Sequence, residues 1–188
     1  MLRVLRYLQG TIDYAVVYGW DTQGLEAGLL GYSDADYAGD TEDRHSTTGH
    51  LFLLNRGPIS WTSAKQRCVA TSTAESEYIA LAEAGKQSQW LQALLRKLQC
   101  EQLLGESLTV PLLRDNQACI TIAQDPTSHN RTKHIDVRYH YIRQLATYGK
   151  VTIDYDPTEK MVADILTKPL AATAFNRCIQ RLIATERN

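Results

Sequence analysis

One long helical segment, residues 72–98, most constrains how this chain can fold. Ser72 or Thr73 can cap its start, Glu75 lies in its first turn, and apolar residues recur along it at helical spacing. Short apolar segments that are predicted to be strands lie on both sides of it: residues 12–18, 27–34, 50–55, 59–63, 108–114 and 150–155. A long helix between groups of strands favours an α/β protein, in which helices pack on the faces of a mixed sheet.

The remaining segments are predicted to be helices and turns. Further helices are expected at residues 2–9, 116–123, 133–147, 159–167 and 171–185. A turn at residues 56–58 is expected to join two strands into a hairpin, and Pro111 predicts an edge position or a bulge for the strand that contains it. Trp61 and Trp90 are expected in the core. At 188 residues, the chain is expected to form one domain.

Charge and cysteine spacing argue against several classes of protein. The net charge of −1 disfavours a free-standing, high-affinity nucleic-acid binder, so any such binding needs localised basic residues or a partner. The chain has no run of about 18 apolar residues, so no membrane helix is expected. Arg3 and Arg6 interrupt its start, so no signal peptide is expected. The four cysteines form no C-x-x-C pair, which disfavours zinc and suits a reducing compartment.

Acidic residues stand at the ends of apolar segments or inside them. Asp34 lies at the end of one strand, Asp115 directly follows another, and Asp164 lies within an apolar helical turn. Glu75 and Glu77 compete for one position in the first turns of the long helix. Buried carboxylates that converge repel each other unless a cation binds, and oxygen ligands favour Mg²⁺ or Mn²⁺. Two such ions about 3.5–4 Å apart can activate water and stabilise the leaving oxygen of a phosphodiester.

Each of these acids also has a purely structural interpretation. Asp34 can begin an Asx-turn, and Asp115 can cap the next helix. Glu75 and Glu77 can interact favourably with the helix macrodipole, while Asp164 can be an exposed helical residue. Their joint occurrence, after two strands and in two helices, is what favours a shared metal site.

Several short stretches carry a further signal: residues 31–40, 46–49, 59–61, 65–66, 72–78, 115–118, 132–140 and 163–170. Together and in this order, they resemble the RNase H domain of copia-type (Pseudoviridae) LTR retrotransposon polyproteins. The resemblance implies an RNase H-like fold, with a five-stranded mixed sheet flanked by helices. It also implies an excised fragment with an added Met1, in which residues 1–26 end the connection region, residues 27–170 form the RNase H domain and residues 171–188 form a C-terminal helix.

The family's RNase H domains carry four carboxylates that bind two Mg²⁺ ions, for which Mn²⁺ can substitute. The matching positions, expected to be catalytic and metal-binding, are Asp34, Glu77, Asp115 and Asp164. Glu77 is preferred to Glu75 because the apolar turn that follows it resembles the family's motif. The two glutamates point about 200° apart around a helix, so only one of them can face the ions well.

One feature departs from the cellular relatives of this family. Many of them have a histidine on the loop before the last aspartate, whereas residues 155–160 contain none. Either product release proceeds without that histidine, or Glu159 or Lys160 substitutes for it. Turnover is therefore expected to be slow.

Recognition of an RNA/DNA hybrid needs contacts with the phosphates and a contact that detects the 2′-hydroxyl group of the RNA strand. The candidate substrate-binding residues are Ser72, Thr73, Asn116, Gln117, Arg131, Lys133 and Arg138. Helix capping is an equally good interpretation of Ser72 and Thr73, and the basic run can be a solvated helix face. The expected partner is the reverse-transcriptase domain of the same polyprotein, with no membrane and no small-molecule cofactor. The expected location is cytoplasmic, in virus-like particles, with the nucleus as an alternative at later stages.

The resemblance thus implies an endonuclease that hydrolyses the RNA strand of RNA/DNA hybrids during reverse transcription by a two-metal mechanism. Two alternatives stay open. One is a catalytically weak or inactive RNase H-like module of the polyprotein that only binds the hybrid. The other is a different two-metal nuclease on the same fold, such as an integrase or a Holliday-junction nuclease, which would act on DNA.

Overall fold

A five-stranded mixed sheet forms the centre of the computed structural model, which describes residues 2–16, 18, 28–104, 109–117, 119–120 and 133–185. The strands lie in the order β4-β3-β2-β5-β6. Their bounds are Gly57–Lys65 (β4), Thr47–Leu54 (β3), Leu29–Asp36 (β2), Val110–Arg114 (β5) and Val151–Tyr155 (β6). β3 pairs antiparallel with β4 and β2, whereas β5 pairs parallel with β2 and β6. The expected five-stranded mixed sheet is therefore confirmed.

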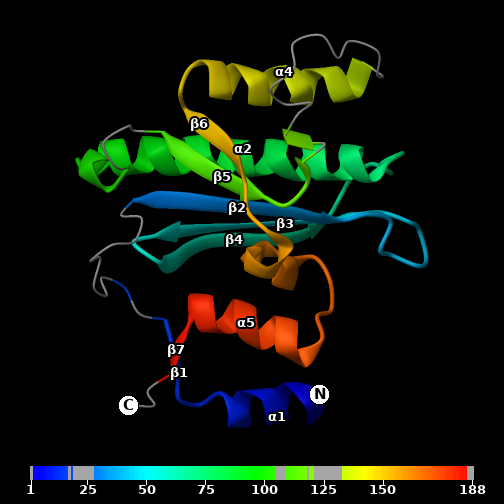
Figure 1. Ribbon diagram of the computed structural model, residues 1–188, viewed down its shortest axis with the longest axis vertical. Coiled ribbons are helices and arrows are strands. Elements are labelled where there is room, and N and C mark those ends of the chain that lie inside the picture. The colour runs from blue at the N-terminus through cyan, green and yellow to red at the C-terminus, as the bar shows by residue number, and fades with distance from the viewer. Residues whose placement is uncertain are drawn as a thin grey trace.

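Helices cover both faces of this sheet (Figure 1). On one face lies α2 (Thr73–Lys97), the long helix predicted from the sequence, and α4 (Lys133–Thr147) packs on its outer side. On the other face lie the short 3₁₀ helices η2 (Thr158–Lys160) and η3 (Val162–Leu166), with α5 (Ala172–Leu182) beyond them. The sheet is thus enclosed by helical layers, as the order of elements predicts.

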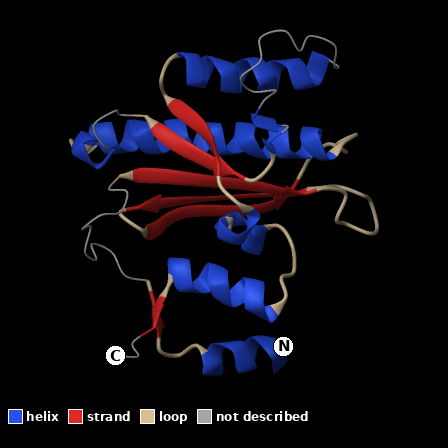
Figure 2. Ribbon diagram, in the orientation of Figure 1, coloured by secondary structure: helices blue, strands red, loops and turns tan. Residues whose placement is uncertain are grey.

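The first and last described elements lie together beyond α5. α1 (Leu2–Gly10) leads into β1 (Tyr14–Ala15), which pairs antiparallel with β7 (Ala184–Thr185). Figure 2 shows this two-stranded sheet well apart from the central one. The ring of Tyr7 meets the ring of Phe175 edge-on, with centroids 6.2 Å apart. α1 therefore lies against α5 and not against the central sheet.

Two clusters of apolar side chains hold the layers together, one on each face of the sheet. The larger cluster, between α2 and the sheet, includes Phe52, Tyr78, Leu81, Leu112 and Ile142. The smaller cluster, between the sheet and η3, includes Tyr32, Leu51, Leu53, Met161 and Val162. Burial of one such side chain contributes roughly 1.5–3 kcal/mol. Both clusters therefore fix the helices that carry acidic residues onto the sheet.

A short 3₁₀ helix, η1 (Glu101–Leu104), follows α2 and precedes β5. β5 lies inside the sheet, so the edge position predicted from Pro111 is wrong. Pairing of β5 with β2 begins only at Leu112, opposite Gly31. The missing amide hydrogen of Pro111 therefore removes no bond from that ladder, which explains why proline is tolerated at an interior strand.

The hairpin and the last helical segments also differ from the expectation. The turn between β3 and β4 lies at Asn55 and Arg56, one residue earlier than predicted, and their φ angles of 46° and 71° fit a type I′ turn. The helix expected at residues 159–167 is two 3₁₀ helices separated by Met161, whose backbone is extended. α5 ends at Leu182, so the last predicted helix is shorter than expected.

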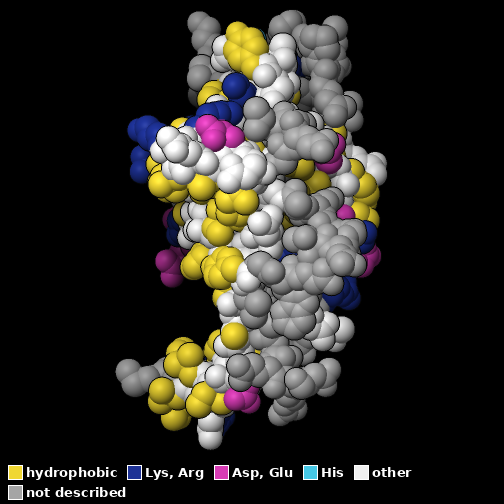
Figure 3. Space-filling view, turned by 90° about the vertical axis from the view of Figure 1, so that its left-hand side faces the viewer, with side chains coloured by type: hydrophobic (Ala, Val, Ile, Leu, Met, Phe, Trp, Pro, Cys, Tyr) yellow, Lys and Arg dark blue, Asp and Glu magenta, His cyan; other side chains and the backbone are white. Residues whose placement is uncertain are grey.

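Large apolar side chains remain exposed at several places on the surface. Trp61 on β4 and Trp90 on α2 are 61% and 57% exposed, so their predicted place in the core is wrong. α1 buries none of its residues, and Leu5 and Leu8 are among its exposed side chains. Figure 3 shows hydrophobic side chains at the surface of the end of the molecule where α1 lies. Among the described residues, no helix combines the length and apolar character needed to span a bilayer.

Candidate active site

Asp34 and Asp115 lie at the same level of the sheet, on neighbouring parallel strands. The last pair between β2 and β5 joins Tyr32 to Leu113, and each acid follows two residues later. Among the residues described on these strands, parallel pairing ends at that point. The two carboxylates therefore flank the place where β2 and β5 part, at the carboxyl ends of both strands.

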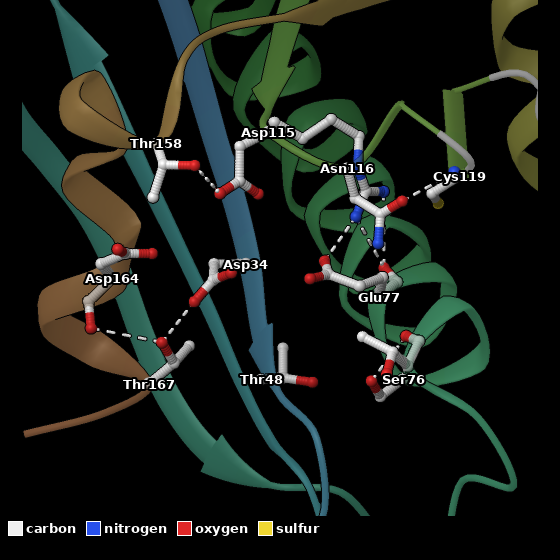
Figure 4. Close-up of polar contacts among 12 residues, drawn as sticks. Asp34, Thr48, Ser76, Glu77, Asp115, Asn116, Cys119, Thr158, Asp164 and Thr167 are labelled. Atoms are coloured by element: carbon white, nitrogen blue, oxygen red, sulfur yellow. Dashed lines mark hydrogen bonds and ion pairs between the residues drawn. The ribbon is translucent and has the colours of Figure 1, made fainter.

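Glu77 reaches the same place from α2. Asp34, Glu77 and Asp115 each offer one carboxylate oxygen, and these oxygens all lie within 4.8 Å of one another. Figure 4 shows the three side chains approaching from β2, from α2 and from the end of β5. Asp34 and Glu77 are buried and Asp115 is half-buried. The structure thus brings together three acids that the sequence singled out.

Glu75 has a different environment, although it is only two residues away. Its Oε2 accepts hydrogen bonds from the backbone N–H and the hydroxyl group of Thr71, both at 2.6 Å. The backbone N–H of Glu75 donates to Oγ of Ser72, the N-cap residue of α2, at 3.2 Å. These contacts satisfy groups at the start of the helix. The geometry therefore places Glu77 in the acidic cluster and Glu75 in the helix cap.

An ion pair closes the cluster on the side of α2. Arg114, the last residue of β5, is fully buried, and its Nη2 donates to Oε2 of Glu77 at 2.5 Å. The same guanidinium approaches the backbone oxygen of Glu77 at 3.4 Å from Nη2 and at 3.5 Å from Nη1. Glu77 and Arg114 are called the α2 side of the cluster below.

A second group of residues joins the cluster from η3. Nζ of Lys168 lies 3.1 Å from Oδ1 of Asp164 and 3.6 Å from Oδ2 of Asp34. The hydroxyl group of Thr167 donates to Oδ2 of Asp34 (Figure 4). This approach depends on Gly49, the partner of Asp34 on β3, because a Cβ there would lie 2.6 Å from Cγ2 of Thr167. Asp164, Thr167 and Lys168 are called the η3 side.

Asp115 has a further contact with the segment after β6. Oγ1 of Thr158 donates to Oδ2 of Asp115 at 2.8 Å. Thr158 belongs to residues 155–160, the segment that contains no histidine. Glu159 and Lys160, the proposed substitutes, are exposed. The contact between this segment and Asp115 is therefore made by a hydroxyl group.

Burial and mutual repulsion shift the protonation equilibria of the cluster. Burial raises the pKa of Glu77 to about 8; Arg114 opposes this shift, while the nearby carboxylates of Asp34 and Asp115 add to it. Burial, followed by the charge of Asp34, raises the pKa of Asp164 to about 6. Buried carboxylates with raised pKa values are groups whose ionised form a bound cation would stabilise.

The cluster fits a divalent cation. Its donors are carboxylate oxygens, the ligands that Mg²⁺, Mn²⁺ and Ca²⁺ prefer. Oxygens bound to one such ion at about 2.1–2.5 Å lie at most about 4–5 Å apart, which matches the 4.8 Å limit for Asp34, Glu77 and Asp115. The ion would also offset the repulsion that raises the pKa of Glu77.

Two of the candidate substrate-binding residues accept backbone hydrogen bonds at helix starts, and two others expose their side chains. Ser72 accepts a hydrogen bond as the N-cap of α2, so capping is confirmed for this residue. Asn116 likewise accepts from the backbone N–H of Cys119 at 3.0 Å, at the start of the predicted helix at residues 116–123. Only residues 117, 119 and 120 of that helix are described, and they are helical. The side chains of Thr73 and Gln117 are exposed.

The basic candidates lie on or before α4. Arg138 is half-buried, and its Nη1 lies 3.7 Å from Sγ of Cys68, in the segment that precedes α2. Arg131 and the side chain of Lys133 lie outside the described residues. Contact of these residues with substrate stays a prediction.

The polar residues that hold the acids were not predicted from the sequence: Arg114, Thr158, Thr167 and Lys168. One of them had a usable signal. Arg114 continues the alternating row of β5 in which Val110 and Leu112 are buried, and a charge in such a row requires a buried partner. The others act through contacts between distant segments, which local spacing does not reveal.

No family model matches the chain, but curated relatives do. The Pol polyprotein of transposon TNT 1-94 from Nicotiana tabacum is 41% identical over 175 residues, which is 93% of this chain and 12% of that protein. The Pol polyprotein of transposon RE2 from Arabidopsis thaliana is 38% identical over 182 residues, 96% of this chain and 12% of that protein. The chain is homologous to a segment of copia-type Pol polyproteins. It spans about an eighth of the length of these relatives.

One relative matches over a shorter length, and solved structures share the fold. Secreted RxLR effector protein 161 from Plasmopara viticola is 53% identical over 95 residues, 50% of this chain and 65% of that protein. RNase H1 from Halobacterium salinarum superposes with a TM-score of 0.53 at 15% identity, covering 74% of this chain and 93% of that chain. The foamy viral protease–reverse transcriptase in complex with an RNA/DNA hybrid superposes with a TM-score of 0.53 at 13% identity. The match covers 86% of this chain and 22% of that chain. The fold is the ribonuclease H fold.

Proposed function

We propose that this chain hydrolyses the RNA strand of RNA/DNA hybrids, as the nuclease part of a retrotransposon Pol polyprotein. The observation that carries the proposal is the convergence of Asp34, Glu77 and Asp115 at the centre of a ribonuclease H fold, with Asp164 beside them. The homologous Pol polyproteins support the setting of reverse transcription. The foamy viral neighbour, solved with an RNA/DNA hybrid, supports the choice of substrate.

The four acids are proposed to hold two Mg²⁺ ions, for which Mn²⁺ can substitute. When bound, such ions supply an activated water and stabilise the leaving 3′ oxygen. The carboxylates serve as ligands, so they must be ionised. Hydroxyl groups hold two of them in place, because Thr167 donates to Asp34 and Thr158 donates to Asp115.

Substrate contacts are proposed around this cluster. Thr73 at the start of α2 and Gln117 next to the cluster expose their side chains and are the candidates for direct contact. The net charge of −1 supplies little attraction for a polyanion, so we propose that the reverse-transcriptase domain of the same polyprotein provides much of the grip on phosphates. Residues 27–170 are the proposed nuclease unit.

Cleavage of a labelled RNA strand annealed to DNA, in Mg²⁺ and in Mn²⁺, tests the proposal. We expect metal-dependent cutting of the hybrid and not of duplex DNA, with 5′-phosphate and 3′-hydroxyl products. Asp115→Asn should slow cutting at least about a hundredfold, because a metal ligand is lost. Asp154→Asn is the matched control, since Asp154 is exposed on β6, where it accepts a hydrogen bond from Thr152.

Two outcomes would redirect the proposal. Unchanged cutting by Asp115→Asn, with the control also active, would reject the acidic cluster as the catalytic site. Absence of cutting in both metals, with retained binding of the hybrid, would favour the second candidate, a weak or inactive hybrid-binding module. The low net charge and the lack of a histidine in residues 155–160 are the observations that favour this second candidate.

A further inference from the structure

We propose that Arg114 is a positioning residue, which holds one carboxylate oxygen of Glu77 and leaves only the other oxygen for a divalent cation. The inference rests on the proposed function, because it concerns how the acidic cluster binds metal. It deepens that function by giving a role to a basic residue that binds neither the cation nor the hybrid.

The contacts of Arg114 restrain both ends of Glu77. Nη2 donates to Oε2 at 2.5 Å and lies 3.4 Å from the backbone oxygen of the same residue. A guanidinium group is planar and donates from a rigid fork, so these two contacts limit rotation of the Glu77 side chain. With Oε2 engaged, Oε1 is the oxygen that remains available to a cation shared with Asp34 and Asp115.

The position of Arg114 in β5 makes this arrangement rigid. The side chain is fully buried, in the row that continues from Val110 and Leu112 on the strand face covered by α2. The adjacent residue, Asp115, supplies another oxygen to the cluster. The end of one strand therefore provides a carboxylate directly and orients a second one, Glu77, through its guanidinium neighbour.

The restraint on Glu77 determines how many of its oxygens can bind a cation. Mg²⁺ prefers six oxygen ligands in near-octahedral geometry, and carboxylates can bind a cation through one oxygen or through two. If Glu77 bound through both oxygens, it would take a position that water or a phosphate oxygen needs. Loss of Arg114 would also remove a positive charge beside the cluster. The cation should then bind more tightly while the hybrid is cleaved more slowly.

An ion pair that served only the fold would have a different effect on metal binding. Its loss would lower the stability in the same way, because a buried charge is left without a partner. A partly unfolded protein would then lose metal binding and cleavage together. Tighter metal binding combined with slower cleavage therefore distinguishes positioning from a purely structural role.

The test compares Arg114→Gln and Arg114→Lys in the whole chain. The Gln variant removes the charge and keeps one amide donor, whereas the Lys variant keeps the charge and loses the fork. For each, the dissociation constant of Mn²⁺ alone is measured by calorimetry, the melting temperature by circular dichroism, and kcat and KM on the hybrid. Arg96→Gln and Arg96→Lys are the controls, because Arg96 lies in the last turn of α2, where its Nη2 donates to Oε1 of Gln92 at 3.3 Å.

For Arg114→Gln, we expect Mn²⁺ to bind about tenfold more tightly and kcat to fall about tenfold, with KM unchanged. For Arg114→Lys, we expect Mn²⁺ affinity within about twofold of the original and a lower kcat, because one ammonium group cannot reproduce the fork. A folded Arg114→Gln protein that binds Mn²⁺ equally or more weakly would overturn the proposal. So would a normal kcat in Arg114→Lys, which alone decides the matter if the Gln variant fails to fold.

If the original chain does not cleave the hybrid, the proposed function fails and the binding measurement still stands. Tighter binding of Mn²⁺ by Arg114→Gln would then support the positioning role on its own. Unchanged or weaker binding would reject it.

Discussion

The carboxylates of the α2 side and of the η3 side are held by two different kinds of basic side chain. Arg114 on the α2 side is fully buried and pairs with one acid, Glu77. Lys168 on the η3 side keeps 35% of its side chain exposed and lies between two acids, Asp34 and Asp164. A buried guanidinium fork fixes geometry, whereas a flexible, hydrated ammonium group can leave. The comparison indicates a site with one fixed half and one adjustable half.

The largest expected effect separates the two glutamates at the start of α2. Glu77→Gln should slow hybrid cleavage at least about a hundredfold, because the α2 side loses its anionic ligand. Glu75→Gln should change cleavage by less than about threefold and lower the free energy of unfolding by about 1 kcal/mol, since Glu75 serves the helix cap. Cleavage rates and denaturant titrations of both variants measure this. The reverse order would assign the metal ligand to Glu75.

A stability measurement tests whether Arg114 and Lys168 differ in how firmly they hold their carboxylates. Arg114→Met should lower the free energy of unfolding by about 3–5 kcal/mol, because Glu77 would be left buried without its partner. Lys168→Met should cost less than this, since the lysine side chain is 35% exposed and water can partly replace it, although both of its acidic partners are buried. Urea titration without divalent cations gives both values. Equal losses would mean that the two sides do not differ in rigidity.

A third expected effect is a pH dependence of stability without metal. The pKa values of Glu77 and Asp164 are raised from 4.5 to about 8 and from 3.8 to about 6. The folded state therefore binds protons that the unfolded state releases, so stability should be full below about pH 4 and fall as the pH rises to about 8. A cation that binds the ionised acids should reverse this loss.

Melting temperatures with and without Mg²⁺ check that dependence. We expect the Mg²⁺-induced increase to be larger at about pH 8 than at about pH 5, because the ligands must be ionised to bind. In Glu77→Gln, the metal-free decline between about pH 6 and pH 8 should be reduced, since the group responsible is gone. An increase of the same size at both pH values would contradict the raised pKa values.

The fold was largely predictable because apolar periodicity decides which face of an element is buried. α2 and the strands that carry Asp34 and Asp115 follow such patterns closely. The predictions were wrong at positions whose burial or strand pairing apolar periodicity does not determine. Pro111 is tolerated in an interior strand because of where pairing begins, and Trp61 and Trp90 are exposed although large aromatic residues are often buried.

The candidate site was predictable only in part. Acids at the ends of strands and in the first turns of a helix pointed to a shared site, and the motifs linked them to one family. The residues that orient these acids act across long separations: Thr167 contacts Asp34 over 133 positions in the sequence, and Thr158 contacts Asp115 over 43. Such contacts depend on the packing of η2 and η3 against the sheet, which no local pattern specifies.

The pairing of β1 with β7 has a mechanical consequence. Because Tyr14 lies opposite Thr185 and Ala15 opposite Ala184, the two ends of the folded unit are clasped side by side. A pull on both ends of the chain would have to break the contact of α1 with α5 and open this two-residue ladder before it strained the central sheet. Because this ladder lies apart from the central sheet, movement at the ends of the chain need not disturb the spacing of the carboxylates.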